Sequence, residues 1–287
     1  MIRMTMSLFR KMEWRRMAVH GWVGVVLIAV CWPANWLLPG LRTHLLFAPL
    51  WIGFALVVDA TVLRRTGTSI ITRSWKDFVL LFVVSAPVWW LFELFNLRTG
   101  NWIYVGREQF SDLAYFFLAT LSFSTVIPAV FGAAELVASF KSISALRNGA
   151  VVRSTPSLRL LLVFLGVVSA ALVWAWPTYF YPLVWGVVFF LLEPVNQWLG
   201  RPSIFRYLNH GDWRPVVSLA LGALLCGVFW EFWNYYSYPK WTYHTPGVDF
   251  LYVFEMPLPG YLGYLPFGLE LYVLSSFAIG REFVRSA

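Results

Sequence analysis

Charged residues and cysteines are both scarce in this chain of 287 residues. Asp, Glu, Lys and Arg make up 13% of it, whereas a water-soluble domain usually carries about 25%. The two cysteines, Cys31 and Cys226, both lie within apolar segments, so we expect neither a disulfide framework nor a zinc site. These shortages exclude a soluble enzyme, a secreted disulfide-stabilised scaffold and a disordered chain.

The sequence also lacks the motifs of several common chemistries. Its four histidines show no HxxH or HxxxH spacing, which argues against a di-iron desaturase, a zinc protease and a haem-binding bundle. A P-loop, a GxGxxG motif and a GxSxG motif are absent as well. We therefore expect no metal and no organic cofactor.

Apolar residues are abundant instead, at 59% hydrophobic and 19% aromatic, with 17 Trp. Several apolar runs, such as 78–95 and 160–176, are long enough for an α-helix to cross roughly 30 Å of hydrocarbon. We therefore predict an all-α, multi-pass membrane protein with about eight transmembrane helices. The expected spans are 21–38, 46–63, 77–96, 113–137, 159–176, 182–197, 215–235 and 262–280.

The basic residues predict the orientation of these spans. With eight spans, all but Arg42, Arg98, Arg107 and Lys240 of the 22 basic residues fall on the side of the N-terminus. Because cytoplasmic loops carry an excess of Lys and Arg, we expect both termini in the cytoplasm, and a bacterial inner membrane as the location. Orientation and contact with anionic membrane lipids account for the net charge of +8, so no nucleic-acid partner is expected.

The two halves of the chain resemble each other. Two sets of residues recur at constant offsets of 134 and 138: Trp51, Asp59, Ser69 and Ile70 as Trp185, Glu193, Ser203 and Ile204, and Trp75, Glu93, Asn96 and Pro128 as Trp213, Glu231, Asn234 and Pro266. We therefore predict two parallel four-helix repeats, residues 1–150 and 151–287, related by an axis along the membrane normal. A site at their interface would receive related residues from both repeats.

Carboxylates within the spans are the candidate catalytic groups, because an ionised carboxylate in a bilayer costs several kcal/mol unless it is paired or protonated. Glu93 and Glu231 each precede an asparagine by three residues, so Asn96 and Asn234 share their helix faces. We expect the two glutamates to act as general acid and base and the asparagines to orient them. Glu270 is a third candidate. Alternatively, each Glu and Asn hydrogen-bonds its own following loop and closes the helix end.

Aromatic residues surround both glutamates in the sequence. The expected substrate-binding residues are Trp89, Trp90, Trp102, Tyr104, Trp230, Trp233, Trp241 and Tyr243. Aromatic faces stabilise cations, so such a pocket suits protonation of an alkene and containment of the carbocation. Segment 254–270 is dense in Pro, Gly and Tyr, which predicts a broken or re-entrant start to the last helix.

The string from Glu93 to Tyr104, E-x-x-N-x-x-T-G-x-W-x-Y, resembles a string in the membrane carotenoid hydratases, which are related to the membrane lycopene cyclases. In the second half, Tyr238-Pro239 replaces the Thr-Gly pair. The resemblance implies a multi-span enzyme that protonates a polyene, with Glu93 as proton donor and Glu231 as its counterpart by duplication.

Three functions are consistent with the sequence. The first is a cofactor-independent enzyme that binds a hydrophobic isoprenoid, carotenoid or lipid and performs hydration, cyclisation or isomerisation. The second is a proton-coupled transporter, in which Glu93, Glu231 and Glu270 carry protons or bind a cationic solute. The third is a nonenzymatic scaffold or assembly factor. A closed apolar cavity would favour the enzyme. A polar path across the membrane would favour the transporter, and a filled interface between the repeats would favour the scaffold.

Overall fold

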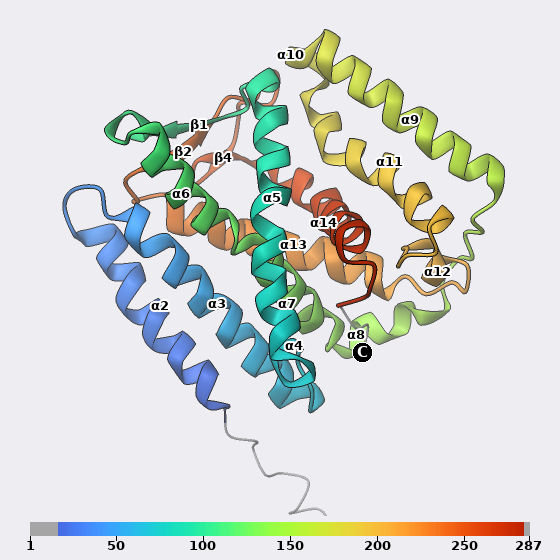
Figure 1. Ribbon diagram of the computed structural model, residues 1–287, viewed down its shortest axis with the longest axis horizontal. Helices are drawn as coiled ribbons and strands as arrows, with labels where there is room; N and C mark the ends of the chain where they lie inside the picture. The colour runs from blue at the N-terminus through green and yellow to red at the C-terminus, as the bar shows by residue number, and fades with distance from the viewer. Residues whose placement is uncertain (1–16, 284–287) are drawn as a thin grey trace, which may run out of the picture.

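The computed structural model describes residues 17–283 of the chain (Figure 1). Within them, eight helical segments are long and apolar enough to span a membrane, which confirms the predicted number and positions. The segments are Val19–Leu37, Thr43–Thr66, Trp75–Thr99, Asp112–Ala138, Pro156–Ala175, Pro177–Trp198, Arg214–Asn234 and Leu258–Ile279. The predicted location of the two chain ends concerns residues outside the described part.

Five of the spans are single helices and three are interrupted. The single helices are α2 (Val19–Leu37), α3 (Thr43–Thr66), α5 (Trp75–Thr99), α9 (Pro156–Ala175) and α13 (Arg214–Asn234). The fourth span comprises α6 (Asp112–Phe123) and α7 (Val126–Ala138), the sixth α10 (Pro177–Phe180), η3 (Tyr181–Leu183) and α11 (Val184–Trp198), and the eighth η4 (Leu258–Gly263) and α14 (Tyr264–Ile279). The 3₁₀ helix η4 is the break expected at the start of the last helix.

Short helices occupy three of the connections on the side opposite the cavity described below: α4 (Ile70–Arg73), α8 (Lys141–Ser144) and α12 (Phe205–Leu208).

Local capping chemistry explains where helix α5 begins and ends. The Ser74 hydroxyl accepts a hydrogen bond from the backbone N–H of Asp77 at its start. At its end Gly100 adopts a left-handed φ of 62°, a conformation that other residues rarely adopt.

Small residues bring the central helices into close contact. A Cβ atom added to Gly24 of α2 would lie 2.6 Å from the backbone oxygen of Gly53 in α3. A Cβ added to Gly222 of α13 would lie 2.6 Å from the backbone nitrogen of Ala134 in α7. Such contacts are the usual basis of helix association in membranes. Helices α7, α13 and α14 therefore form the buried centre (Figure 1), whereas α9 exposes apolar side chains such as Phe164 along its length.

Two short antiparallel ribbons lie in the connections and were not part of the all-α prediction. Strand β1 (Trp102–Val105) pairs with β2 (Lys240–Tyr243), and β3 (Tyr252–Val253) pairs with β4 (Met256–Pro257). The first ribbon joins the connection after α5 to the connection after α13, which lie 138 residues apart in sequence. Trp102 and Tyr104 of β1, and Trp241 and Tyr243 of β2, are two residues apart and so share a face of the ribbon.

Candidate functional site

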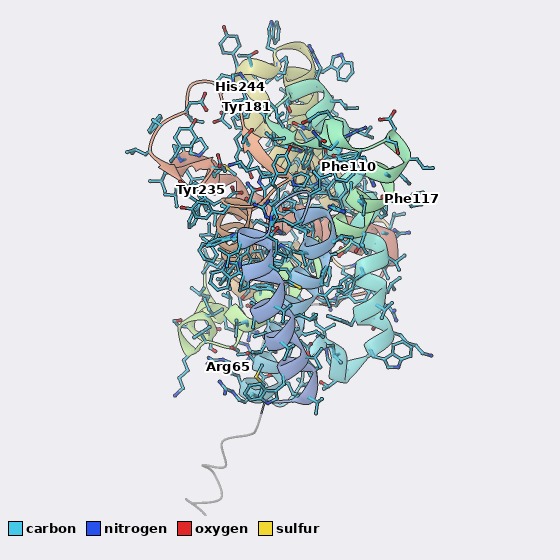
Figure 2. All side chains as sticks on the ribbon, turned by 90° about the vertical axis from the view of Figure 1, so that its left-hand side faces the viewer. Arg65, Phe110, Phe117, Tyr181, Tyr235 and His244 are labelled. Carbon is cyan, nitrogen blue, oxygen red and sulfur yellow. The ribbon has the colours of Figure 1, made fainter. Side chains whose placement is uncertain are left out.

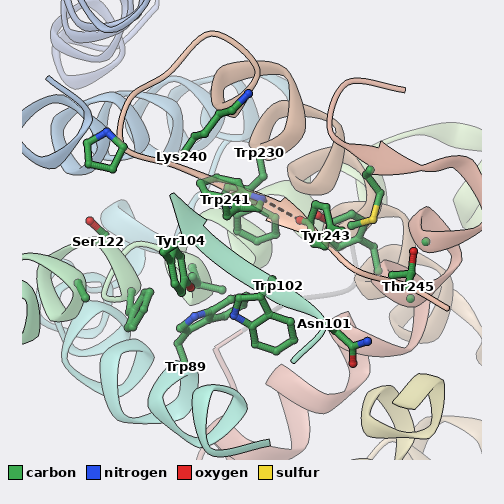
Figure 3. A pocket seen from close by; sticks show the side chains of 18 of the residues that line it. Trp89, Asn101, Trp102, Tyr104, Ser122, Trp230, Lys240, Trp241, Tyr243 and Thr245 are labelled. Atoms are coloured by element: carbon green, nitrogen blue, oxygen red, sulfur yellow. Dashed lines mark hydrogen bonds between the residues drawn. The ribbon is translucent and has the colours of Figure 1, made fainter. Parts of the chain in front are cut away.

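A cavity of about 560 Å³ lies over the first ribbon (Figure 3). It is lined by parts of α3, α5, α6, α13, both strands of the ribbon and the interrupted starts of the sixth and eighth spans. Its aromatic lining residues are Phe47, Trp89, Trp102, Tyr104, Phe110, Tyr115, Phe123, Tyr181, Trp185, Trp230, Trp241, Tyr243 and Tyr264. The volume falls within the range of small-molecule sites, roughly 300–1,000 Å³.

The ribbon presents four aromatic side chains to this cavity. Trp102 lies opposite Tyr243, and Tyr104 lies opposite Trp241. Residues two apart on a strand share a face, and so do cross-strand partners. All four rings therefore lie on one face and line the cavity, whereas Ile103, on the other face, is exposed. The arrangement has a local twofold character, since Trp faces Tyr in both pairs.

Glu93, near the end of α5, lies behind the wall that contains Trp102. One oxygen, Oε1, accepts hydrogen bonds from Trp89 Nε1 at 2.9 Å, Trp102 Nε1 at 3.1 Å and the Tyr104 hydroxyl at 2.6 Å. All three donors belong to residues that line the cavity, and the carboxylate does not line it directly. A ligand in the cavity therefore meets these donors before the acid.

Glu231 holds the corresponding place near the end of α13 and is completely buried. Its Oε1 accepts hydrogen bonds from the hydroxyls of Tyr243 at 2.5 Å and Tyr264 at 2.8 Å. Trp241 Nε1 donates to the Tyr243 hydroxyl at 2.8 Å, the bond drawn in Figure 3. This carboxyl group is also separated from the cavity by the residues bonded to it.

The two glutamates, which were expected to act as general acid and base, do not contact each other through a hydrogen bond. Each binds aromatic donors, and within residues 17–283 no hydrogen bond joins one carboxyl group to the other. Burial, with the neighbouring charge of Glu93, raises the pKa of Tyr104 well above its ordinary value. Burial and Glu231 raise the pKa of Tyr243 in the same way. Both phenols therefore keep their protons at neutral pH and are weaker acids than a free tyrosine, so they can serve as relays to the glutamates rather than as acids on their own.

Asn96 and Asn234 bind the ribbon rather than the glutamates. Asn96 Nδ2 donates to the Trp102 carbonyl at 2.8 Å, and Asn96 Oδ1 accepts from the Trp102 N–H at 3.1 Å. Asn234 makes the same two bonds with the backbone of Trp241, at 2.7 and 3.0 Å. A side-chain amide can imitate a strand in this way because it carries both a donor and an acceptor. The expected orienting contact with the acids is thus replaced by one that fixes the aromatic strands.

Four tryptophans near the glutamates have different positions. Trp89 and Trp230 line the cavity as expected. Trp90 instead turns towards α6, where its Nε1 donates to Thr120 Oγ1 at 3.0 Å, because adjacent helical residues point about 100° apart. Trp233 packs edge-on against Trp51 of α3, with ring centroids 5.1 Å apart, and is buried in the core. Trp90 and Trp233 are therefore not among the residues that line the cavity.

Glu270 stabilises a broken helix. Its Oε1 accepts a hydrogen bond from the backbone N–H of Val188 at 3.0 Å. The helix around Val188 is interrupted at Trp185, whose ψ of 16° is not helical, and an N–H after such a break has no partner within the helix. Glu270, the third candidate from the sequence, is fully buried and does not line the cavity.

Sequence analysis missed several lining residues. Tyr264 supplies the second phenol on Glu231, and Trp185 stacks on Trp102 with ring centroids 6.1 Å apart. Trp185 was recognised as a repeated residue and Tyr264 lies in the Pro-, Gly- and Tyr-rich segment, so both could have been proposed as lining residues from the sequence. Arg107 and Tyr115, which form a cation–π pair at 4.2 Å, carried no sequence signal.

Comparison with other proteins assigns no function to the cavity. No family model, no curated protein and no solved structure matches the chain. The function is therefore inferred from three features of the site: aromatic walls, two glutamates bonded to wall tyrosines, and a ribbon that joins the two halves.

Proposed function

We propose that the protein is an integral membrane enzyme that binds a hydrophobic isoprenoid, carotenoid or lipid in this cavity and acts on it by general acid–base chemistry. One observation carries the proposal: the walls of a large aromatic cavity contain tyrosines whose hydroxyls are bonded to two glutamates behind them. The apolar walls suit a hydrocarbon chain, and the tyrosines provide protons where the chain would lie.

The proposed chemistry is proton transfer through phenols. In a hydration, Tyr243 or Tyr264 gives its proton to one alkene carbon and is reprotonated from Glu231. Water then bonds to the cation left on the second carbon and releases a proton through Tyr104 to Glu93, so that the sum is addition of one water molecule. The cycle closes when Glu93 releases that proton to water and Glu231 takes one up. In an isomerisation or cyclisation, the cation itself returns a proton to the base. The indole faces of Trp102 and Trp241 stabilise the cation in each case.

The aromatic packing around Phe267, next to the cavity, favours an enzyme over a transporter. Phe267 is buried and contacts the rings of Trp89, Trp185 and Trp230, all of which line the cavity. A second, smaller cavity of about 200 Å³ is lined by Ile70, Arg73, Ser74, Asp77, Glu282 and Phe283, and it shares no lining residue with the first. A transport path would have to separate this aromatic packing.

We further infer that the two halves are parallel repeats with the cavity on the extracytoplasmic side. Equivalent contacts support the duplication. Asp59 accepts from the N–H of Ile71 and Glu193 from the N–H of Phe205, which is the same pair at the offset of 134. The distribution of basic residues supports the orientation, with both termini cytoplasmic in a bacterial inner membrane.

The test compares lipid and pigment extracts by mass spectrometry. The strains carry a deletion, the restored gene, or the restored gene with Glu93→Gln and Glu231→Gln together. We expect one species to accumulate in both the deletion and the double variant, and that species is the substrate. Tyr179→Phe is the matched control, because Tyr179 is 78% exposed and does not line the cavity. A deletion that changes an extract which the double variant leaves normal would exclude acid catalysis at these residues.

A further inference from the structure

The segment between β2 and the last span carries an unusual apolar surface. Residues 249–257, which we call the lid hairpin, contain β3, β4 and the turn between them. Phe250, Leu251, Tyr252 and Val253 are consecutive and between 41% and 69% exposed. Four large exposed apolar side chains in a row indicate a contact surface rather than a loop in water. Figure 2 shows Tyr235 and His244 on the side of the molecule where this connection projects.

The other side of the same segment forms part of the cavity wall. Met256 of the hairpin is buried and lines the cavity, as does Val248 just before the hairpin. Phe254 packs against α13, with its ring 5.5 Å from that of Phe232 and 5.6 Å from that of Tyr235. The hairpin therefore contributes one part of the cavity wall and exposes apolar side chains on its other side.

Both acidic residues of the lid hairpin are bonded to the protein. Asp249 Oδ1 accepts hydrogen bonds from the backbone N–H and hydroxyl of Thr245, at 3.1 and 2.5 Å. Glu255 forms an ion pair with Lys240 of β2, which also lines the cavity. The charge of Glu255 is therefore paired, whereas Asp249 is exposed and is hydrogen-bonded by a neutral residue, so the hairpin suits the membrane–water interface rather than the hydrocarbon.

The apolar surface continues into a membrane span. Leu258 and Leu262 of η4 are 50% and 65% exposed, and they begin the candidate span Leu258–Ile279. Tyr252 has the amphipathic character typical of the membrane–water interface. Continuity with the exposed start of this candidate span favours lipid, rather than a protein partner, as the contact of the hairpin.

The backbone of the hairpin is held in a sparsely populated conformation. Leu251 and Phe254 have φ values of 54° and 59°, although neither is glycine. Such conformations persist where surrounding contacts enforce them. The contacts that hold it include two paired residues on each strand, the Lys240–Glu255 pair and the ring contacts of Phe254. The Leu258 N–H also donates to the Leu251 carbonyl at 3.0 Å, and the Tyr261 hydroxyl donates to the Val253 carbonyl at 3.0 Å.

We propose that the outer face of the lid hairpin is a lipid-binding surface that lies in the bilayer interface beside the last span, and that a membrane-dissolved ligand reaches the cavity from lipid by displacing this hairpin. The lipid contact is independent of the proposed catalysis. The access route rests on the proposed function, because it presupposes a hydrophobic ligand.

Site-specific fluorescence quenching tests the lipid contact. Full-length protein with Cys31→Ala, Cys226→Ala and Leu251→Cys is labelled with bimane and placed in nanodiscs of phosphatidylcholine and phosphatidylglycerol. We expect brominated lipid to quench the label within about twofold of its effect at a lipid-facing control, Phe164→Cys on α9, and aqueous iodide to have little effect. Glu108→Cys, an exposed position in η1, is the control for water.

Quenching by iodide but not by brominated lipid would overturn the proposal. Tyr252→Cys is the second labelling site if the first variant does not fold. Because the measurement uses no substrate, its failure leaves the proposed acid–base chemistry intact, and an inactive glutamate variant leaves the lipid contact intact.

Hydrogen exchange tests the opening of the hairpin. Glu255→Gln removes the ion pair between the hairpin and Lys240. We therefore expect the backbone amides of residues 251–257 to exchange about two- to fivefold faster than in the parent protein in the same nanodiscs. Asp112→Asn, which breaks the Arg107–Asp112 pair elsewhere around the cavity, is the matched control and leaves these amides unchanged. Equal exchange in both variants and the parent protein would contradict the role of Lys240 in closing the hairpin.

Discussion

Glu93 and Glu231 occupy corresponding places in the two halves but have different hydrogen-bond donors. Glu93 accepts from two indoles and one phenol, whereas Glu231 accepts from two phenols. An indole N–H only donates, while a phenol both donates and accepts and so can relay a proton. The side of Glu93 therefore has one proton route to the cavity, and the side of Glu231 has two.

The largest expected effect comes from removing either carboxyl group. Glu93→Gln and Glu231→Gln keep the shape of the side chain but remove its acid–base function, so each should lower product formation about 10²- to 10⁴-fold. The measurement is product formed by purified protein in lipid, once the extracts identify the substrate. A residual activity near that of the parent in either variant would show that this half takes no part in the chemistry.

Substitutions of the tyrosines test whether Glu93 has one proton route to the cavity and Glu231 has two. Tyr104→Phe removes the only phenol on Glu93 and should match the loss in Glu93→Gln. Tyr243→Phe leaves Tyr264 on Glu231 and should cost less than about tenfold, whereas the double Tyr243→Phe, Tyr264→Phe variant should approach Glu231→Gln. Equal losses in Tyr104→Phe and Tyr243→Phe would contradict the difference between the halves.

Substitutions of Asn96 and Asn234 compare how much each half contributes to the free energy of unfolding. Asn234 is 1% exposed and Asn96 is only partly buried, although both bind a strand backbone twice. Asn234→Ala should lower the free energy of unfolding by about 1–3 kcal/mol, since it leaves a buried N–H and C=O without partners, and Asn96→Ala should lower it less. Thermal unfolding in detergent measures both, with Asn209→Ala, whose side chain binds one backbone N–H at the opposite end, as control.

The smallest expected effect is on alkaline titration. The pKa values of Tyr104 and Tyr243 are raised in the folded protein, by burial first and by the adjacent glutamates second. An unfolded tyrosine ionises near pH of about 10. The stability that these phenols contribute is therefore complete below that pH and decreases as the pH rises above it. Phenolate absorbance that develops around pH 10 should be smaller in the folded protein than in the unfolded chain, and Tyr104→Phe should leave it unchanged in the folded protein.

The spans could be predicted from the sequence because lipid leaves the backbone few choices. A run of about 20 apolar residues must form a helix in a bilayer, and all eight runs do. The positions of Glu93, Glu231 and their aromatic neighbours along the chain were also recognisable, because polar residues are rare within these runs.

The orienting contacts between the asparagines and the glutamates were predicted wrongly. The alternative, in which each Glu and Asn hydrogen-bonds its own following loop, matches the bonds of Glu93 and Asn96 and those of Glu231 and Asn234. Helical spacing placed Asn96 on the face of Glu93, yet its amide finds better partners in the backbone of Trp102. The kink at Trp185 created an unpaired N–H that Glu270 satisfies, which depends on how α11 and α14 pack. Pairing of β1 with β2 is a contact between segments 138 residues apart, and no local pattern specifies it.

The first ribbon has a consequence for which substitutions the chain should tolerate. Trp102 lies opposite Tyr243 and Tyr104 lies opposite Trp241, so each cross-strand pair takes one residue from each half of the chain. A replacement at one position changes the neighbour of its cross-strand partner, and compensating substitutions should therefore arise in pairs that cross the middle of the gene. The four positions should vary together between related sequences, even though they lie in two halves of the chain.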